Sequence, residues 1–137
     1  MTAVLEYCGN SLKIADFMYV PEDPEPYNCS FDMLVKSGLW AGCAVGCECG
    51  YLTIKTFADE LAELYDFQRK AVAFDAGYGN CLLFEMNEIG HLEISGEIHG
   101  NAGACYMKFR FEADQTVLPD FIRQLKKMTG RRITNDF

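Results

Sequence analysis

The chain has 137 residues, of which half are hydrophobic, and its formal net charge is −8. This length suits one domain with a self-sufficient core, so the composition excludes a disordered chain and predicts a single domain over residues 1–137. A surface of this charge repels phosphate groups, which excludes nucleic acid and anionic membranes as expected partners.

The negative charge is unevenly distributed along the chain. Residues 1–122 carry seven basic and nineteen acidic side chains, a balance of −12, and the remaining basic residues lie near the C-terminus. Two explanations fit this pattern: an acidic surface keeps a small protein soluble, and it also attracts a basic partner. The sequence leaves both open.

The seven cysteines indicate the redox compartment. No basic segment followed by a long apolar run precedes them, and no stretch approaches the length of a membrane span. An odd number of cysteines without a secretory leader is typical of reduced thiols rather than a disulfide framework. We therefore expect a cytoplasmic protein.

The N-terminal part contains three segments with the character of strands. Ser11–Val20 and Phe31–Lys36 alternate between apolar and polar residues, and the Gly- and Cys-rich segment Trp40–Gly50 is a third candidate. Between the first two, Pro21–Pro26 contains three prolines and three acidic residues. Such a segment can join neither a helix nor a sheet, so we expect an exposed loop.

A helical pattern follows these strands. Apolar residues recur every three or four positions from Ile54 onward, with charged residues on the opposite face. Thr53 or Thr56 would cap this helix, because a threonine hydroxyl can accept a hydrogen bond from a free amide of the first turn. The apolar positions are Ile54, Phe57, Leu61, Leu64 and Tyr65.

Two hairpins are predicted after this helix. Ala71–Asp75 and Asn80–Asn87 flank a Gly77-Tyr78-Gly79 turn, and Gly90–His99 alternates most regularly with Cys105–Glu112. The segment Gly100-Asn101-Ala102-Gly103 would connect the second pair. Apolar faces must pair with each other, which fixes the polar partners on the solvent side. These are Glu93 or Glu97 across from Arg110 or Lys108.

The last element is a second amphipathic helix that begins near Thr116. Pro119 suits its first turn, Lys126 and Lys127 suit its last turn, and Gly130 provides a stop. The whole order predicts an α+β fold with a mainly antiparallel sheet of about seven to eight strands. Two amphipathic helices, one mid-chain and one C-terminal, pack on that sheet.

Residues with potential for chemistry do not form a recognisable site. Cys43, Cys47 and Cys49 are all at odd-numbered positions, so they would lie on the same face of a regular strand. A zinc site, however, needs four ligands, and no fourth is nearby. His91 and His99 are about 26 Å apart along a strand, too far to bind one ion together. We expect no metal, no cofactor and no catalytic residue. A Cys–His pair, and hence a thiol-dependent enzyme, is the least favoured alternative.

Exposed aromatic and acidic residues are the candidates for partner binding. Trp40, Tyr51, Tyr78 and Tyr106 can be interface anchors or ordinary sheet residues, and the sequence favours neither. Acidic residues of the Pro-rich loop and of the predicted strand Gly90–His99 complete the set. The candidates are Glu22, Asp23, Glu25, Trp40, Tyr78, Glu93 and Glu97.

Three segments resemble the WapI-like immunity proteins of bacterial contact-dependent toxin systems. They are the helix over residues 56–64, the strand over residues 90–97, and the run over residues 109–119 that leads into the last helix. The resemblance covers roughly residues 30–128. Its most specific part is Asp114-Gln115-Thr116, followed by Leu118 and Pro119, behind a Phe-x-Phe strand. Because Asp and Thr stand where a helix is capped, we interpret this motif as structural.

The resemblance implies a single-domain cytoplasmic protein that binds a cognate toxin and blocks it without catalysis. If the toxin is a basic nuclease, an acidic inhibitor would associate with it faster. The alternative is a self-associating scaffold that uses exposed sheet edges or the Gly-rich strand.

Overall fold

The computed structural model describes residues 1–100 and 105–135, and the chain passes twice through four antiparallel strands and a helix. Each set of strands forms its own sheet, in the orders β1-β2-β3-β4 and β5-β6-β7-β8. The α+β prediction is confirmed. The elements are β1 Ala3–Tyr7, β2 Asn10–Tyr19, β3 Cys29–Ser37, β4 Trp40–Cys49, α1 Tyr51–Tyr65, β5 Ala71–Asp75, β6 Cys81–Met86, β7 His91–Gly100, β8 Cys105–Asp114, a short 3₁₀ turn η2 Gln115–Val117, and α2 Leu118–Asn135.

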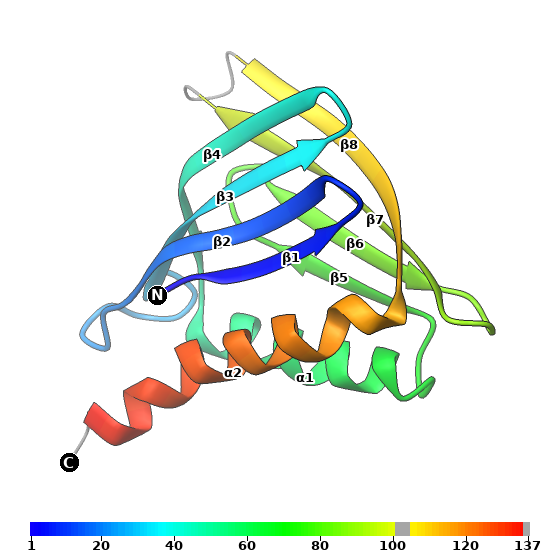
Figure 1. The fold of residues 1–137 in the computed structure, drawn as a ribbon. Helices are drawn as coiled ribbons and strands as arrows, with labels where there is room; N and C mark the ends of the chain where they lie inside the picture. The colour runs from blue at the N-terminus through cyan, green and yellow to red at the C-terminus, as the bar shows by residue number, and fades with distance from the viewer. Residues whose placement is uncertain (101–104, 136–137) are drawn as a thin grey trace.

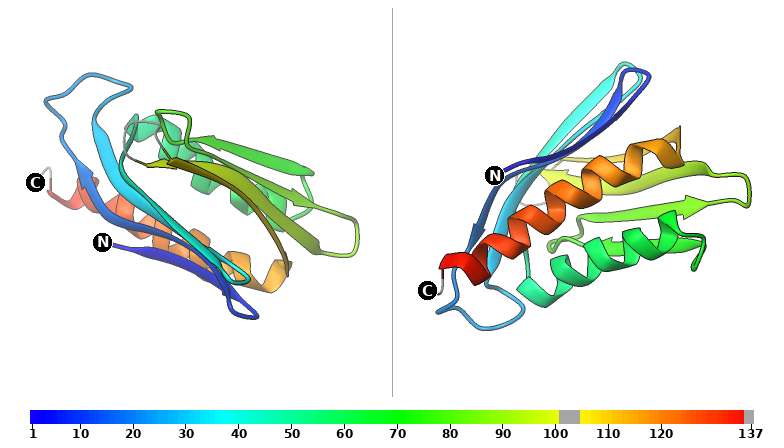
Figure 2. Two further views of the ribbon diagram at one scale, coloured as in Figure 1. Left: turned by 90° about the horizontal axis from the view of Figure 1, so that it is seen from above. Right: turned by 60° about the horizontal axis from the view of Figure 1, so that its bottom comes forward.

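The two sheets meet at one side and separate at the other. They approach each other at β4 and β8, at the top of Figure 1, and β4 packs against β7 there. The helices α1 and α2 lie side by side across the open side between the sheets (Figure 2). We call the side where the sheets meet the apex. It lies opposite the helices.

A cluster of phenylalanine rings joins both helices to both sheets. The ring centroid of Phe57 in α1 lies 4.3 Å from that of Phe74 in β5 and 5.7 Å from that of Phe84 in β6. Phe121 of α2 stacks on Phe84 at 6.3 Å, and Phe31 of β3 stacks on Phe74 at 6.0 Å. Truncating such a ring to alanine costs about 3–5 kcal/mol, so this cluster contributes much of the stability.

The pairing of β7 with β8 follows the predicted register. Ile94 lies opposite Phe111 on the inner face, and Glu97 lies opposite Lys108 on the outer face. Arg110 lies opposite Ser95, and its Nη1 is 3.6 Å from Glu93 Oε1. The predicted turn over residues 100–103 falls largely on residues 101–104, which lie outside the described residues.

The start of α1 differs from the prediction. The helix begins at Tyr51 after Gly50, and neither predicted threonine caps it. Two side chains from the loop between β2 and β3 bind its free amides instead. Asn28 Oδ1 accepts a hydrogen bond from the Tyr51 N–H at 2.7 Å, and Glu25 Oε1 accepts one from the Leu52 N–H at 3.2 Å. The predicted exposed loop is confirmed, and it has a structural function as well.

The helix α2 continues through Gly130 to Asn135, so the predicted stop at Gly130 is wrong. Gly130 does not take the left-handed conformation that ends a helix, because its φ angle is not positive. Lys126 and Lys127 therefore lie inside the helix rather than in its last turn. Tyr51, for which the sequence left an interface anchor and an ordinary sheet residue open, is a buried helix residue, and its hydroxyl donates a hydrogen bond to the Thr129 carbonyl oxygen at 3.1 Å.

A β-bulge interrupts β4 and changes which side chains face the core. Gly46 has a φ of +75°, and the pairing with β3 shifts by one residue near it. As a result Cys47 and Cys49 are buried whereas Cys43 is exposed. The expectation that these three thiols share a face is wrong, because one inserted residue reverses the alternation of a strand.

Candidate partner-binding groove

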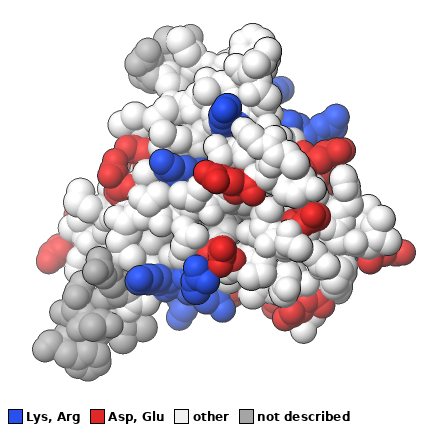
Figure 3. All heavy atoms as spheres, in the orientation of Figure 1, with Lys and Arg blue, Asp and Glu red and all other residues white. Residues whose placement is uncertain are grey.

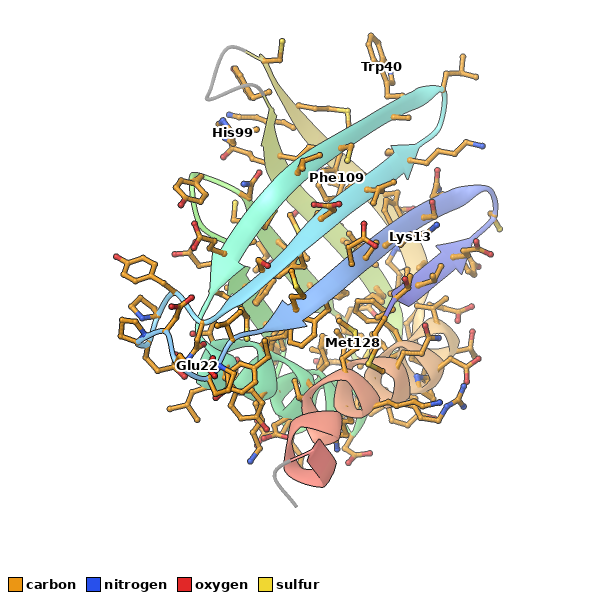
Figure 4. The ribbon with its side chains drawn as sticks, turned by 90° about the vertical axis from the view of Figure 1, so that its left-hand side faces the viewer. Lys13, Glu22, Trp40, His99, Phe109 and Met128 are labelled. Atoms are coloured by element: carbon orange, nitrogen blue, oxygen red, sulfur yellow. The ribbon has the colours of Figure 1, made fainter. Side chains whose placement is uncertain are left out.

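A groove of about 1060 Å³ lies at the apex, between β4 and the ends of β7 and β8. We call it the β4–β7 groove. Its apolar side chains come from both sheets and from the turn between β5 and β6. Figure 4 shows Trp40 and His99 at this end of the molecule. The large side chains that line the groove are Trp40, Val45, Tyr78, Ile98, His99, Tyr106 and Met107.

Several of these apolar side chains are exposed to solvent. The exposed fractions are 74% for Trp40, 70% for Tyr78, 63% for Tyr106 and 77% for Val45. Leu39, next to Trp40 in the turn before β4, is fully exposed. Aromatic side chains are enriched among the residues that contribute most to protein–protein affinity, and grouped exposed apolar residues mark interaction sites.

Close packing of the two sheets forms the floor of the groove. A Cβ atom on Gly42 of β4 would lie 2.7 Å from Ile98 Cδ1, so glycine at this position lets β4 approach β7. Met107 of β8 also lies against Gly42. The glycine-rich character of β4 therefore has a packing function at this position.

Tyr78 is presented by a turn whose backbone is unusual. Gly77, Tyr78 and Gly79 have φ angles of 79°, 55° and 86°. This left-handed conformation costs a non-glycine residue on the order of 1–2 kcal/mol. A Cβ on Gly77 would lie 2.6 Å from the Glu48 carbonyl oxygen, so position 77 requires glycine for space as well as for conformation. The predicted Gly-Tyr-Gly turn is confirmed.

Hydrogen bonds fix this turn to both sheets. The Glu48 N–H of β4 donates to the Ala76 carbonyl oxygen at 3.0 Å. The buried Asn80 accepts a hydrogen bond from the His99 N–H of β7 at 2.7 Å and donates one to the Gly77 carbonyl oxygen at 2.9 Å. Tyr78 is therefore held in a rigid frame, although its ring is exposed.

Two glutamates stand beside the groove. The Tyr78 hydroxyl donates a hydrogen bond to the Glu48 carboxylate, and this bond raises the pKa of Tyr78. Glu97 Oε1 lies 3.9 Å from Nε2 of His99, whose ring stacks on Tyr106 at a centroid distance of 5.4 Å. Among the residues that the structure describes, no lysine or arginine lines the groove. Aromatic side chains thus line the groove, and each of the two glutamates contacts one of its lining residues.

Comparison with known proteins identifies the family of the chain. Residues 14–131 match the model of the Immunity protein WapI-like family. The chain belongs to this family. The match includes the segments that carry the resemblance in the sequence and extends further toward the N-terminus, into β2. Immunity is therefore the general role of the protein.

Two other comparisons add less. No curated protein matches the sequence. The crystal structures of Trypanosoma bruciei MRP1/MRP2 contain a chain that superposes with a TM-score of 0.54 at 10% sequence identity, over 100% of this chain and 87% of that chain. At this identity the likeness concerns the fold alone.

In this WapI-like protein, the acidic candidates of the Pro-rich loop lie outside the groove. Glu22 and Asp23 are exposed in the loop between β2 and β3, and Figure 4 places Glu22 far from Trp40. Glu25 lies against the start of α1, where a Cβ on Gly50 would overlap Glu25 Oε2. The structure thus brings together Trp40 and Tyr78 but not these acidic residues.

The two glutamates of β7 lie on the outer face of the second sheet. Glu93 is near Arg110, whereas Glu97 reaches the rim of the groove through His99. Sequence reasoning missed Glu48 and Asn80, which contact the turn only in the folded chain. The asparagine directly after Gly-Tyr-Gly was the one available signal, since asparagine often hydrogen-bonds its own turn.

The two buried cysteines at the end of β4 are unsuited to act as nucleophiles in the folded protein. Burial raises the pKa of the Cys47 thiol to about 11, and it also raises the pKa of Cys49. A nucleophilic thiol needs the opposite shift. Over residues 1–100 and 105–130, no three His, Cys, Asp or Glu side chains are placed to hold a metal ion. None of the described helices has the length and hydropathy needed to cross a membrane.

Proposed function

We propose that this WapI-like protein acts in the cytoplasm, as one domain and without catalysis, by binding a cognate toxin domain. In this proposal the β4–β7 groove is the centre of the contact. The observation that carries it is the group of exposed aromatic residues, Trp40, Tyr78 and Tyr106, in a member of an immunity protein family.

A rigid groove favours tight binding because little order must be gained on association. Tyr78 is already fixed by its turn, so its ring loses little freedom when a partner covers it. Residues that dominate interfaces typically cost more than 2 kcal/mol of binding free energy when truncated to alanine. We expect Trp40 and Tyr78 to behave in this way.

The net charge of −8 suits a basic toxin, and nucleases that bind phosphate are one such class. Complementary charge raises association rates toward about 10⁸ M⁻¹s⁻¹ at low salt. Rapid association matters for an inhibitor that must act before its target damages the cell. Acidic surface outside the groove, including Glu22 and Asp23, would contribute through this long-range attraction.

The test is to produce the chain together with the toxin domain of a large secreted protein encoded beside it. We expect growth to be rescued and a stoichiometric complex to co-purify. The W40A and Y78A double variant should lose both effects if the groove is the contact. A folded wild-type chain that gives neither rescue nor complex with that toxin domain would contradict the proposal.

Self-association is the second candidate function, and the exposed Leu39, Trp40 and Val45 favour it. An apolar surface of this kind can also bind a second copy across a two-fold axis. Light scattering on the purified chain distinguishes the two functions. A stable oligomer that W40A dissociates would assign the groove to self-association, and a monomer would leave it free for a partner.

A further inference from the structure

The carboxylate of Glu48 has capacity for a cationic partner. Glu48 is partly buried, and the Tyr78 hydroxyl occupies one of its two oxygen atoms. An ionised carboxylate can accept about four hydrogen bonds. Of the described residues, no lysine or arginine forms an ion pair with Glu48, so the groove itself supplies no compensating positive charge.

The aromatic ring of Tyr78, which contacts this carboxylate, is also suited to a cation. The faces of Trp and Tyr rings attract lysine and arginine side chains, and a planar guanidinium can stack on such a ring while it hydrogen-bonds a carboxylate. Tyr78 combines both features, because its exposed ring is hydrogen-bonded to Glu48. Trp40 lines the same groove with its ring exposed.

Acidic side chains beside the groove agree with this chemistry. Glu48 and Glu97 stand near the groove, and Asp32 accepts a hydrogen bond from the Gly46 N–H at 3.0 Å. On the face shown in Figure 3, basic side chains lie both over α2 and in the upper part of the view, toward the apex. The local carboxylates and the net charge of −8 are therefore the charges that favour a basic segment.

We propose that the β4–β7 groove binds an arginine or lysine side chain of a basic segment on the toxin domain, with the cation held between the Tyr78 ring and the Glu48 carboxylate. This inference rests on the proposed immunity function and names the chemistry of its partner. The strained backbone of Tyr78 supports it, because strain of this kind persists where the surrounding structure enforces it and is concentrated at functional sites.

The inference can be tested with a cationic probe as well as with the toxin. Isothermal titration calorimetry on the purified chain measures the binding of such a probe. We expect hexa-arginine to bind saturably and hexa-glutamate to show no binding. E48Q should weaken hexa-arginine binding by about tenfold, since a charge-assisted hydrogen bond is lost. E88Q, which removes an exposed charge outside the groove, should change the affinity for hexa-arginine by less than about twofold.

The same variants applied to the toxin complex separate the two proposals. We expect E48Q to weaken toxin binding by about tenfold and to reduce its salt dependence, with Y78A weaker still. If wild type protects cells while E48Q and E88Q bind hexa-arginine and toxin equally well, the cation site is overturned and the immunity function stands. If wild type fails to protect but hexa-arginine binding still depends on Glu48, the immunity function fails and the cation site stands.

Discussion

The hydroxyl of Tyr51, at the start of α1, donates a hydrogen bond to the backbone carbonyl of Thr129 in α2 at 3.1 Å. The two residues are 78 positions apart in the sequence, and both are buried. This bond connects the two helices that close the open side between the sheets (Figure 2). The position of α1 therefore depends on α2 as well as on its own sequence.

We predict that Y51F lowers the free energy of unfolding by about 1 kcal/mol, because one buried hydrogen bond is lost while the ring remains. Urea denaturation followed by circular dichroism measures this change. Tyr65, at the exposed end of α1, provides the control, and Y65F should stay within about 0.5 kcal/mol of wild type. Equal stability of both variants would show that the bond contributes nothing.

The turn that presents Tyr78 gives the second prediction. G77A should lower the free energy of unfolding by about 2 kcal/mol or more, because it combines a positive φ with a contact of 2.6 Å to the Glu48 carbonyl oxygen. The control is G38A, whose φ is also positive but whose Cβ would meet no atom within 4 Å, so it should cost only about 1 kcal/mol. Thermal and urea unfolding measure both. Equal losses would contradict the importance of the contact with β4.

A third prediction separates the two functions considered for the Pro-rich loop. E25A should destabilise the protein by about 0.5–1 kcal/mol, because it removes a hydrogen-bonded carboxylate from the N-terminus of α1. D23A, in the same loop, should stay within about 0.5 kcal/mol of wild type. Denaturant unfolding of the two variants in parallel provides the measurement. If E25A unfolds like D23A, Glu25 does not stabilise α1.

The loop can be tested for binding separately from stability. The double charge reversal E22K and D23K should slow association with a basic toxin, because these side chains are exposed and act over a distance. Stopped-flow measurements at two salt concentrations report the effect. Association rates and salt dependence equal to those of wild type would eliminate the loop from partner attraction.

The sequence predicted the elements that depend on local pattern. The alternation of β7 and β8 gave their register, including Glu97 opposite Lys108, and Gly77-Tyr78-Gly79 gave the turn. The prediction failed where contacts with distant parts of the chain determine the local structure. The cap of α1 comes from Glu25 and Asn28, more than twenty residues earlier, so no inspection of its own first turn could find it.

The candidate site was predicted only in part, for a similar reason. Trp40 and Tyr78 were each candidates for partner binding, although the sequence could not distinguish interface anchors from ordinary sheet residues. Their presence in one groove depends on β4 packing against β7. The bulge at Gly46 was also missed, because β4 consists mostly of small residues and shows no clear alternation whose reversal would reveal an inserted residue. That bulge decides which cysteines are buried.

A further prediction concerns Asp114, which precedes η2 and α2. Its Oδ1 accepts hydrogen bonds from the Thr116 hydroxyl and the Thr116 N–H, the latter at 2.9 Å, and these bonds lower the pKa of Asp114 below its ordinary 3.8. A depressed folded pKa means that the contribution to stability is present above the unfolded pKa and is lost as the pH falls through the folded one. The melting temperature of wild type should therefore fall more steeply below about pH 4 than that of D114N. Melting temperatures that fall in parallel with pH for wild type and D114N would contradict this prediction.

The last prediction tests the alternative of a thiol-dependent enzyme. Cys8, Cys43 and Cys105 are exposed, whereas Cys29, Cys47 and Cys49 are buried. At pH 8 we expect iodoacetamide to modify the exposed thiols in the folded protein and the buried ones only after unfolding, as measured by mass spectrometry. Burial also raises the pKa of Cys47 to about 11, which slows its reaction in the folded state further. A thiol in the folded protein that reacts much faster than free cysteine would contradict a purely binding role, because rapid alkylation requires a stabilised thiolate.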